Sequence, residues 1–446
     1  MDEALLQRLR AYARDHHDQE LELLRTLAGI PAPTHHEERR AAFVAEWLRR
    51  QGANEVWVDG QKNVLCLLRR PSGESDHAAP SRPQASPGTP SPCRDLVLFC
   101  AHTDVVFDDV EPFEVREEGG RLLAPGIGDD TANLVALLMA TSCLLEHPQE
   151  LAAATARADL LVVANSCEEG LGNLDGTKAV FRWLEACGTT VRAFVSLDLY
   201  LPQCIGVAVG SERWRIEVRT QGGHSYHDFG RPNAITHLCR VVGELYASTL
   251  PQDPTTGART TINVGRIEGG STVNAIASQA SCLFEYRSES AANLAAMRTR
   301  LQEVVANAGE RGVRTSLERI GMRPGNAGIR PEAQERVTRL ACEAIRSVTG
   351  KEPDLSPAST DANIPLSLGI PALTVGTVRG GLLHTRDEWV DPGSLEDGLV
   401  LALALMLELP GAAMSQDDLI HKLNCPQAPH NHLPRQRKVT SHRSLA

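Results

Sequence analysis

Acidic residues and histidines follow strongly apolar runs of this sequence at the points where those runs end. The residues concerned are His102, Asp104, Asp129, Asp130, Glu168, Glu169, Asp198 and His384. In open α/β sheets, the loops at the carboxyl ends of the strands form the ligand site. We therefore expect five separate segments of the chain to deliver carboxylates and imidazoles to one rim of a sheet.

Such a group of side chains needs a cation. An unpaired acid next to a core-type run carries a desolvation cost, and several carboxylates at one place repel one another and raise their pKa values. A bound metal removes both problems. Two histidines with four or five carboxylates, and no cysteine, suit Zn²⁺, with Mn²⁺ or Co²⁺ as alternatives. An H-x-D motif or an acidic pair alone is more often a solvated surface feature, so the shared position of these residues carries the hypothesis.

The elements that position these residues alternate between strand and helix. Buried strands are predicted at 64–68, 96–100, 160–165, 194–197 and 372–375, and helices at 133–145, 177–186, 332–348 and 395–407. Leucines recur at helical spacing in 3–28. A further helix is predicted from Thr34 to Gly52, with Glu37 completing a capping box. This alternation indicates an α/β domain whose mixed sheet has helices on both faces.

Residues 212–320 follow another order, β-α-β-β-α-β, which is a compact unit of its own. It interrupts the α/β domain, which we assign to 1–211 and 321–410. A segment rich in Pro and Ser at 71–92 and the tail 411–446 have too few bulky apolar residues to form a core, so we expect both to be disordered.

Composition excludes several classes of function. The chain of 446 residues has a formal charge of −11, which argues against partners such as nucleic acids or anionic membranes. No apolar run is long enough to span a membrane, and the charged N-terminus shows no signal peptide. The 11 cysteines are scattered and lack CxxC spacing, so we expect reduced thiols and a cytoplasmic protein.

The combined motifs resemble the M20 family (M20/M25/M40) of co-catalytic zinc metallopeptidases. The segments that carry the resemblance are HTDVV, GDDTAN, NSCEEGLGNLDG, SLD, GGHSYHDFGRPNAI, GGSTVNAIA, EYRSE, STDANIP and HTRDEW. They occur in family order over about residues 21–409, apart from the Pro-rich insertion. The family includes tripeptide aminopeptidases of the peptidase T type, dipeptidases, carboxypeptidases and amide deacylases.

The resemblance implies two zinc ions per subunit. Asp129 would be the carboxylate that bridges them. One ion would also bind His102 and Asp198, and the other would bind Glu169 and His384. Glu168 matches the general base that activates a metal-bound water, and Asp104 matches the acid that orients His102. In such sites two metals lower the pKa of the water and polarise a carbonyl, while a free carboxylate transfers the proton to the leaving amine.

The resemblance also implies that 212–320 is a lid and dimerisation domain. His224 matches a lid histidine that reaches the partner subunit's active site and stabilises the oxyanion, so a homodimer through the lid is expected. Asn274 and Arg287 match positions that hold polar groups of the substrate, and Arg287 would hold a carboxylate. If the resemblance is set aside, the alternative interpretation of His224 is an imidazole that makes hydrogen bonds in a turn, and that of Arg287 is an exposed cation on a surface strand.

The chain departs from the family pattern in two places. Thr131 stands where relatives often have Lys, and Leu199 and Tyr200 follow Asp198 where many have Gly or Glu-Pro. Aspartate at 198 resembles the aminopeptidase and dipeptidase branches of the family, which implies a peptidase of short peptides. An amide deacylase that releases an amino acid from an N-acyl or N-carbamoyl conjugate is the alternative. A third hypothesis, a silent homologue that only binds such molecules, is disfavoured because every implied ligand and Glu168 are present.

Overall fold

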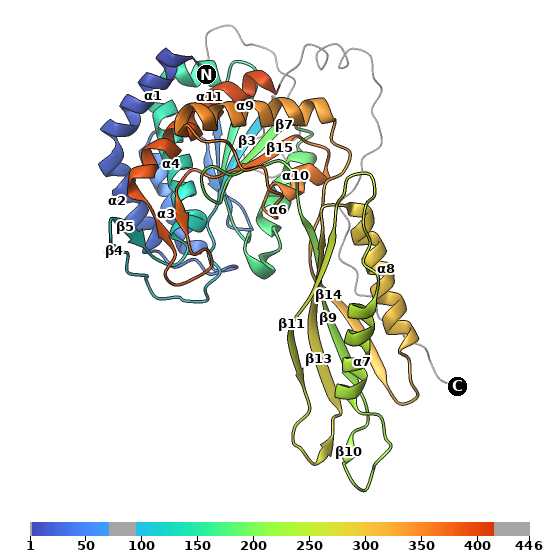
Figure 1. The fold of residues 1–446 in the computed structure, drawn as a ribbon. Coiled ribbons are helices and arrows are strands. Elements are labelled where there is room, and N and C mark those ends of the chain that lie inside the picture. The colour runs from blue at the N-terminus through green and yellow to red at the C-terminus, as the bar shows by residue number, and fades with distance from the viewer. Residues whose placement is uncertain (1, 71–94, 414–446) are drawn as a thin grey trace. The chain divides into compact units, whose positions relative to one another are not determined.

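The computed structural model describes residues 2–70 and 95–413, which separate into two compact units (Figure 1). The first contains the described residues up to Ala208 together with those from Gly328 onward, and the second is Val209–Ala327. The predicted disordered insertion at 71–92 lies outside the described residues, as does the tail from 414. The tail was predicted to start at about 411, and the last helix ends at Ala412.

The first unit is built on a mixed seven-stranded sheet. Its order is β1 (Val56–Val58), β2 (Val64–Leu68), β6 (Asp159–Asn165), β3 (Leu96–His102), β7 (Val191–Leu197), β15 (Ala372–Val375) and β8 (Cys204–Ile205). The central strands β6, β3, β7 and β15 are parallel, whereas β2 and β8 are antiparallel to their neighbours. The carboxyl ends of the four parallel strands therefore meet at one edge.

Helices cover both faces of this sheet, which confirms the predicted fold class. Alternate residues of β2 belong to two different apolar clusters, Val64 to one and Leu65 to the other. The first cluster includes α1 (Glu3–Asp15), α2 (His17–Ala28), α3 (Glu38–Arg50), α4 (Asn133–Glu146), α5 (Pro148–Ala154), α9 (Pro331–Thr349) and α11 (Leu395–Ala412). The second includes α6 (Asp175–Ala186) and α10 (Asn363–Ser367). Burial on both faces explains why the strands read as continuous apolar runs.

The predicted capping box at Thr34 is wrong. Helix α3 begins only at Glu38, and the hydroxyl of Thr34 donates instead to the carboxylate of Asp104 at 2.9 Å. The carboxylate of Glu37 accepts hydrogen bonds from the backbone amides of His35 and Cys167. Both polar side chains thus connect the turn before α3 to the segments that follow β3 and β6.

A second, four-stranded sheet in the first unit joins segments that are far apart in sequence. Its strands are β16 (Gly380–Gly381), β17 (Trp389–Val390), β5 (Arg121–Leu123) and β4 (Arg116–Glu118), in that order. The pairing of β17 with β5 brings the segment before β17 next to the kinked segment η1 (Ile127–Ala132) that leads into α4.

The second unit is a four-stranded antiparallel sheet with two helices packed on it. Its strand order is β11 (Thr260–Gly269), β13 (Gln279–Ser288), β9 (Gly210–Arg219) and β14 (Arg314–Arg323), and its helices are α7 (Ala234–Ala247) and α8 (Ala291–Asn307). Alternate residues of β9 and β13 are buried against those helices. The short strands β10 (Gly223–His224) and β12 (Ala275–Ile276) pair separately.

No helix within the described ranges combines the length and the apolar character that crossing a membrane requires.

Candidate metal centre

The five predicted metal ligands are brought together at the edge where the parallel strands end. His102 is the last residue of β3, and Asp198 directly follows β7. Glu169 follows β6, Asp129 lies in η1, and His384 lies between β16 and β17. The ligand atoms of His102, Asp129 and Asp198 lie within 4.8 Å of one another, as do those of Asp129, Glu169 and His384. Asp129 is the member common to both groups.

The carboxylate of Asp129 lies between two imidazoles. Its Oδ1 is 2.8 Å from Nε2 of His102, and its Oδ2 is 3.0 Å from Nε2 of His384. Nε2 of His384 is also 3.3 Å from a carboxylate oxygen of Glu169. One carboxylate therefore directs its two oxygens at two separate clusters of ligand atoms, which is the geometry of a bridging ligand.

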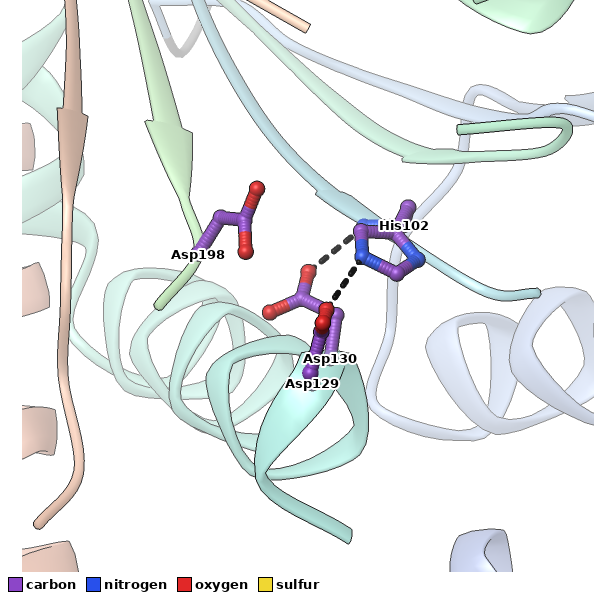
Figure 2. Close-up of side chains that lie close together, drawn as sticks. All are labelled: His102, Asp129, Asp130 and Asp198. Carbon is purple, nitrogen blue, oxygen red and sulfur yellow. Dashed lines mark hydrogen bonds and ion pairs between the residues drawn. The ribbon is translucent and has the colours of Figure 1, made fainter. Parts of the chain in front are cut away.

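Figure 2 shows a further acid in the first cluster, Asp130, which the sequence reasoning left without a role. Asp130 is fully buried, and its Oδ2 accepts a hydrogen bond from the backbone amide of His102 at 2.7 Å. It thereby fixes the end of β3, which carries His102. The signal for it was the second acid of the Asp-Asp pair, in a loop that leads directly into an apolar helix.

The charges at this edge are unbalanced in a way that fits a cation. Burial, with the charge of Asp129, raises the pKa of Glu169 to about 8 and raises the pKa of Asp198 well above its usual range. Burial likewise raises the pKa of Asp130. Buried oxygens of Asp198 and Asp130 have no hydrogen-bond partner in the part of the chain that the structure describes, and the buried Oε1 of Glu169 contacts Nε2 of His384 at 3.3 Å. Orphaned carboxylate oxygens beside two imidazoles form a donor set that suits Zn²⁺ or a similar divalent ion.

The histidines show the complementary effect. Hydrogen bonds to Asp129 and Glu169 raise the pKa of His384 to about 10. Burial alone would lower the pKa of His102, but the charge of Asp130 and the contacts with Asp104 and Asp129 outweigh it and raise the pKa. The carboxylates therefore favour positive charge on both imidazoles, and a metal ion would supply such charge in their place.

The predicted supporting acid, Asp104, is buried and makes more contacts than expected. Its two carboxylate oxygens accept hydrogen bonds from the backbone amides of Glu168 and Glu169, each at 2.9 Å. Nδ1 of His102 lies 3.0 Å from the backbone carbonyl of Asp104 and 3.5 Å from its carboxylate. The imidazole is therefore oriented mainly by the carbonyl, whereas the carboxylate holds the acidic pair.

Glu168, the predicted general base, is 5% exposed and lies with His102 and Glu169 in a third cluster of ligand-type atoms. Its charge acts on Asp361, an acid that the sequence analysis quoted only within a motif. Asp361 is fully buried and accepts hydrogen bonds from the side chains of Asn165 and Thr177, each at 2.5 Å. Burial, with the charge of Glu168, raises the pKa of Asp361 to about 7.

The three predicted lid residues lie in the second unit, and only two of them are close together. His224 pairs with Ala275 between β10 and β12, and the backbone carbonyl of Asn274 accepts from the amide of Ser225. Arg287 lies near the other end of β13, eight residues beyond the start of that strand at Gln279. At roughly 3.3 Å per residue, it is far from the His224 end.

The surroundings of these side chains differ as well. Nδ1 of His224 accepts from the backbone amide of Tyr226 at 3.2 Å, so its proton is on Nε2. The guanidinium of Arg287 forms two hydrogen bonds with the carboxylate of Glu285, at 2.7 and 3.1 Å. The side chain of Asn274 accepts from the hydroxyl of Thr272.

Comparison with known proteins identifies the family of this chain. The model for peptidase family M20/M25/M40 matches residues 98–408. A succinyl-diaminopimelate desuccinylase of Gluconobacter oxydans is 30% identical over 356 residues, covering 75% of this chain and 86% of that protein.

Solved structures share the fold at lower identity. Aminopeptidase PepT from Bacillus cereus superposes with a TM-score of 0.63 at 18% identity, covering 88% of this chain and 98% of its own. A dinuclear metal-binding peptidase of the M20 family from Bacillus subtilis gives 0.59 at 14% identity, covering 90% and 99%.

Proposed function

This chain belongs to peptidase family M20/M25/M40, and from that premise we propose that it is a di-zinc hydrolase that cleaves amide bonds of short peptides. The observation that carries the proposal is the position of Asp129. One of its carboxylate oxygens contacts His102 and the other contacts His384, and these two histidines belong to different clusters of ligand atoms. The Bacillus subtilis neighbour, which is described as binding a dinuclear metal, supports two ions here.

The ligands would divide between the two ions as the resemblance implies. His102 and Asp198 would hold one ion, and Glu169 and His384 the other, with Asp129 shared between them. A bound pair of zinc ions would lower the pKa of a water and polarise the scissile carbonyl. Mn²⁺ or Co²⁺ could replace Zn²⁺ in the same nitrogen and oxygen donors.

The chain's own residues supply the proton transfer. Glu168 would take the proton of the attacking water and deliver it to the leaving nitrogen, which is the work of a general base and then a general acid. Asp104 holds Glu168 and Glu169 by their backbone amides, so that one carboxylate serves as base and its neighbour as ligand.

A deacylase of N-acyl amino acids is the second candidate. The relatives named succinyl-diaminopimelate desuccinylase favour it, because that activity also hydrolyses an amide, with a succinyl group in place of an aminoacyl group. Both reactions use the same ligands and the same base, so the site geometry suits either.

A substrate panel separates the two. Purified protein loaded with Zn²⁺ should be assayed on di- and tripeptides, N-acetyl amino acids and N-succinyl amino acids, with release of a free amine as the readout. Peptide turnover at least tenfold above that of both conjugates supports the peptidase, and the reverse order supports the deacylase. Zinc binding without turnover of any amide would favour the silent, ligand-binding homologue.

The second unit would act as the lid and the dimer interface. His224 and Asn274 lie at one end of this unit, while Arg287 lies near the other end of β13. As the resemblance implies, His224 would reach the partner subunit's active site, and Asn274 and Arg287 would hold polar groups of the substrate. With its proton on Nε2, His224 can donate to an oxyanion that develops only in the transition state.

A reducing, cytoplasmic setting completes the proposal. The nine cysteines in the described ranges are free thiols, and eight of them are buried. Such thiols persist in compartments where glutathione and thioredoxin keep cysteine reduced.

A further inference from the structure

Glu388 is a buried acid that none of the assigned roles uses, and four donors surround its carboxylate. Its Oε1 accepts from the backbone amides of Gly128 at 2.9 Å and Asp129 at 2.7 Å, and from the hydroxyl of Tyr200 at 3.0 Å. Its Oε2 accepts from the backbone amide of Gly126 at 3.0 Å. With 1% of its surface exposed, Glu388 faces the protein on every side.

These contacts join three segments that each carry a predicted metal ligand. Glu388 lies four residues after His384, and Tyr200 lies two residues after Asp198. The three amides belong to the loop that presents Asp129. A single carboxylate therefore connects the segments after β7, before β17 and before α4, which enter the site from different parts of the chain.

Asn133 forms a second connection between the same regions. Its amide nitrogen donates to the backbone carbonyls of Gly128 at 3.1 Å and Leu199 at 3.0 Å. Its amide oxygen accepts from the backbone amide of Thr377 at 2.8 Å and from its hydroxyl at 2.6 Å. The whole hydrogen-bonding capacity of this side chain is used, and it holds the Asp129 loop against the segment after Asp198.

Close packing leaves these contacts little freedom. The ring of Tyr200 lies against Gly128 and Gly380, where an added Cβ would overlap ring atoms of Tyr200. A Cβ on Gly128 would also lie 2.9 Å from Oε1 of Glu388. The loop can approach the tyrosine and the acid this closely because those positions are glycines.

We propose that Glu388, Tyr200 and Asn133 are positioning residues that set the separation and direction of the metal ligands Asp129, Asp198 and His384. Together these three residues form a ligand brace. This inference rests on the proposed function, because it concerns the geometry of the same metal site. Tyr200 is one of the residues at which this chain departs from the family pattern.

The ligand brace should raise the affinity for zinc by holding the metal ligands in the positions that the ions require. Groups that hold metal ligands in place typically contribute about 10–100-fold to metal affinity or activity. Tyr200→Phe removes one hydroxyl and keeps the packing of the ring. Glu388→Gln keeps the shape but replaces one acceptor oxygen with an NH₂ group that faces a backbone N–H. Matched controls are Tyr12→Phe and Asp387→Asn. The hydroxyl of Tyr12 contacts Glu146, and Asp387 is an exposed neighbour of Glu388 that pairs with Arg116.

The test measures zinc affinity by competition with a chromophoric chelator, together with the melting temperature of the metal-free protein. We expect Tyr200→Phe and Glu388→Gln to bind zinc about 10–100-fold more weakly than wild type, and both controls to match wild type. The metal-free melting temperature of Tyr200→Phe should stay close to that of Tyr12→Phe. Unchanged zinc affinity with a lowered metal-free melting temperature would mean that the three residues only stabilise the fold, and would overturn the inference.

The same experiment keeps this inference distinct from the proposed function. Zinc affinity does not depend on turnover. A wild type that binds zinc but hydrolyses no amide would contradict the proposed function, and the effect of the ligand brace on zinc affinity could still be measured. If Glu388→Gln does not fold, Tyr200→Phe decides the question alone. If both fold, the double variant should lose less than the sum of the single losses, because Tyr200→Phe removes the hydrogen bond that Glu388→Gln weakens by removing the charge of the acceptor. Full additivity would contradict a shared brace.

Discussion

The carboxylate of Asp104 accepts a hydrogen bond from the backbone amide of Glu168 at 2.9 Å. The acid of the H-x-D motif is therefore bound to the segment that carries the proposed general base, more than sixty residues later in the chain. Its other oxygen holds the next amide, that of Glu169, and the hydroxyl of Thr34. One buried side chain thus determines where both residues of the acidic pair point.

Replacing Asp104 by Asn should disorganise that pair. An amide side chain offers one acceptor oxygen, and its NH₂ group would face a backbone N–H. We expect kcat/KM to fall about 10–100-fold, as for other residues that support metal ligands. Steady-state kinetics of the zinc-loaded variant would measure this, with the exposed Asp108→Asn as control. Equal kcat/KM in the two variants would contradict the role of Asp104.

Glu168→Gln should retain its metals and lose turnover. The amide keeps the shape of the side chain but cannot accept the proton of the water, and a general base contributes about 10²–10⁴-fold. Elemental analysis should show zinc content close to wild type, while kcat falls. The exposed Glu185→Gln serves as control. Full activity in Glu168→Gln would remove Glu168 from the mechanism.

Metal removal should lower both activity and stability. A ligand that binds only the native state stabilises it, so stripping zinc with a chelator should lower the melting temperature, and adding zinc back should restore it. Asp129→Ala should reduce zinc content more than His384→Ala, because Asp129 faces both clusters of ligand atoms and His384 only one. An unchanged melting temperature and unchanged activity after chelator treatment would contradict the proposed metal site.

Glu20 on α2 should make stability depend on pH. It is fully buried, neither carboxylate oxygen has a hydrogen-bond partner among the described residues, and burial with the charge of Glu396 raises its pKa from 4.5 to about 8. Because the folded state holds the proton more tightly, the contribution of Glu20 to the free energy of unfolding should be most favourable below about pH 4.5 and should fall as the pH rises towards 8.

Glu20→Leu tests this. The variant should melt at a higher temperature than wild type at pH 8, and the difference should shrink at pH 5, where wild-type Glu20 is protonated in the folded state. Thermal unfolding across this pH range would measure it, with Glu22→Leu, an exposed position of the same helix, as control. An identical pH dependence in Glu20→Leu and wild type would refute the effect.

His224 should act across a subunit interface. His224→Ala and Glu168→Gln homodimers should both be nearly inactive. Mixed dimers should recover activity, because one site then combines an intact Glu168 with an intact His224 from its partner. Light scattering checks the dimer, and assays on verified heterodimers check the recovery. Full activity of a monomer, or no recovery in the heterodimer, would exclude the trans arrangement.

The sequence predicted the central elements well because local pattern and tertiary context agree there. Strand β15 was placed at its observed residues, and α4 and α11 were found with their first residues correct. Continuous apolar runs can only lie inside such a fold, so burial and local propensity lead to the same assignment. The convergence of acids at one edge followed from the rule that parallel strands end together.

Residues whose roles depend on distant partners were not predictable. Thr34 has the sequence of a cap, yet its hydroxyl bonds Asp104, seventy residues away, because the chain turns there before α3 starts. Glu388 reads as one more exposed acid in a charged stretch. Its burial arises from the pairing of β17 with β5, which no local pattern reveals.

The first unit is assembled from two stretches of chain, and this has a consequence for its synthesis. Strand β15 pairs with β7, but the ribosome produces it only after the whole second unit. Until then one edge of β7 lacks its parallel neighbour, and an unpaired strand edge is a template for association with other chains. His384 emerges later still, so the nascent protein carries an incomplete set of ligands. In the proposed di-zinc hydrolase, metal loading would therefore be a late event in biogenesis, and premature termination before β15 would yield a product that is prone to aggregate and lacks His384.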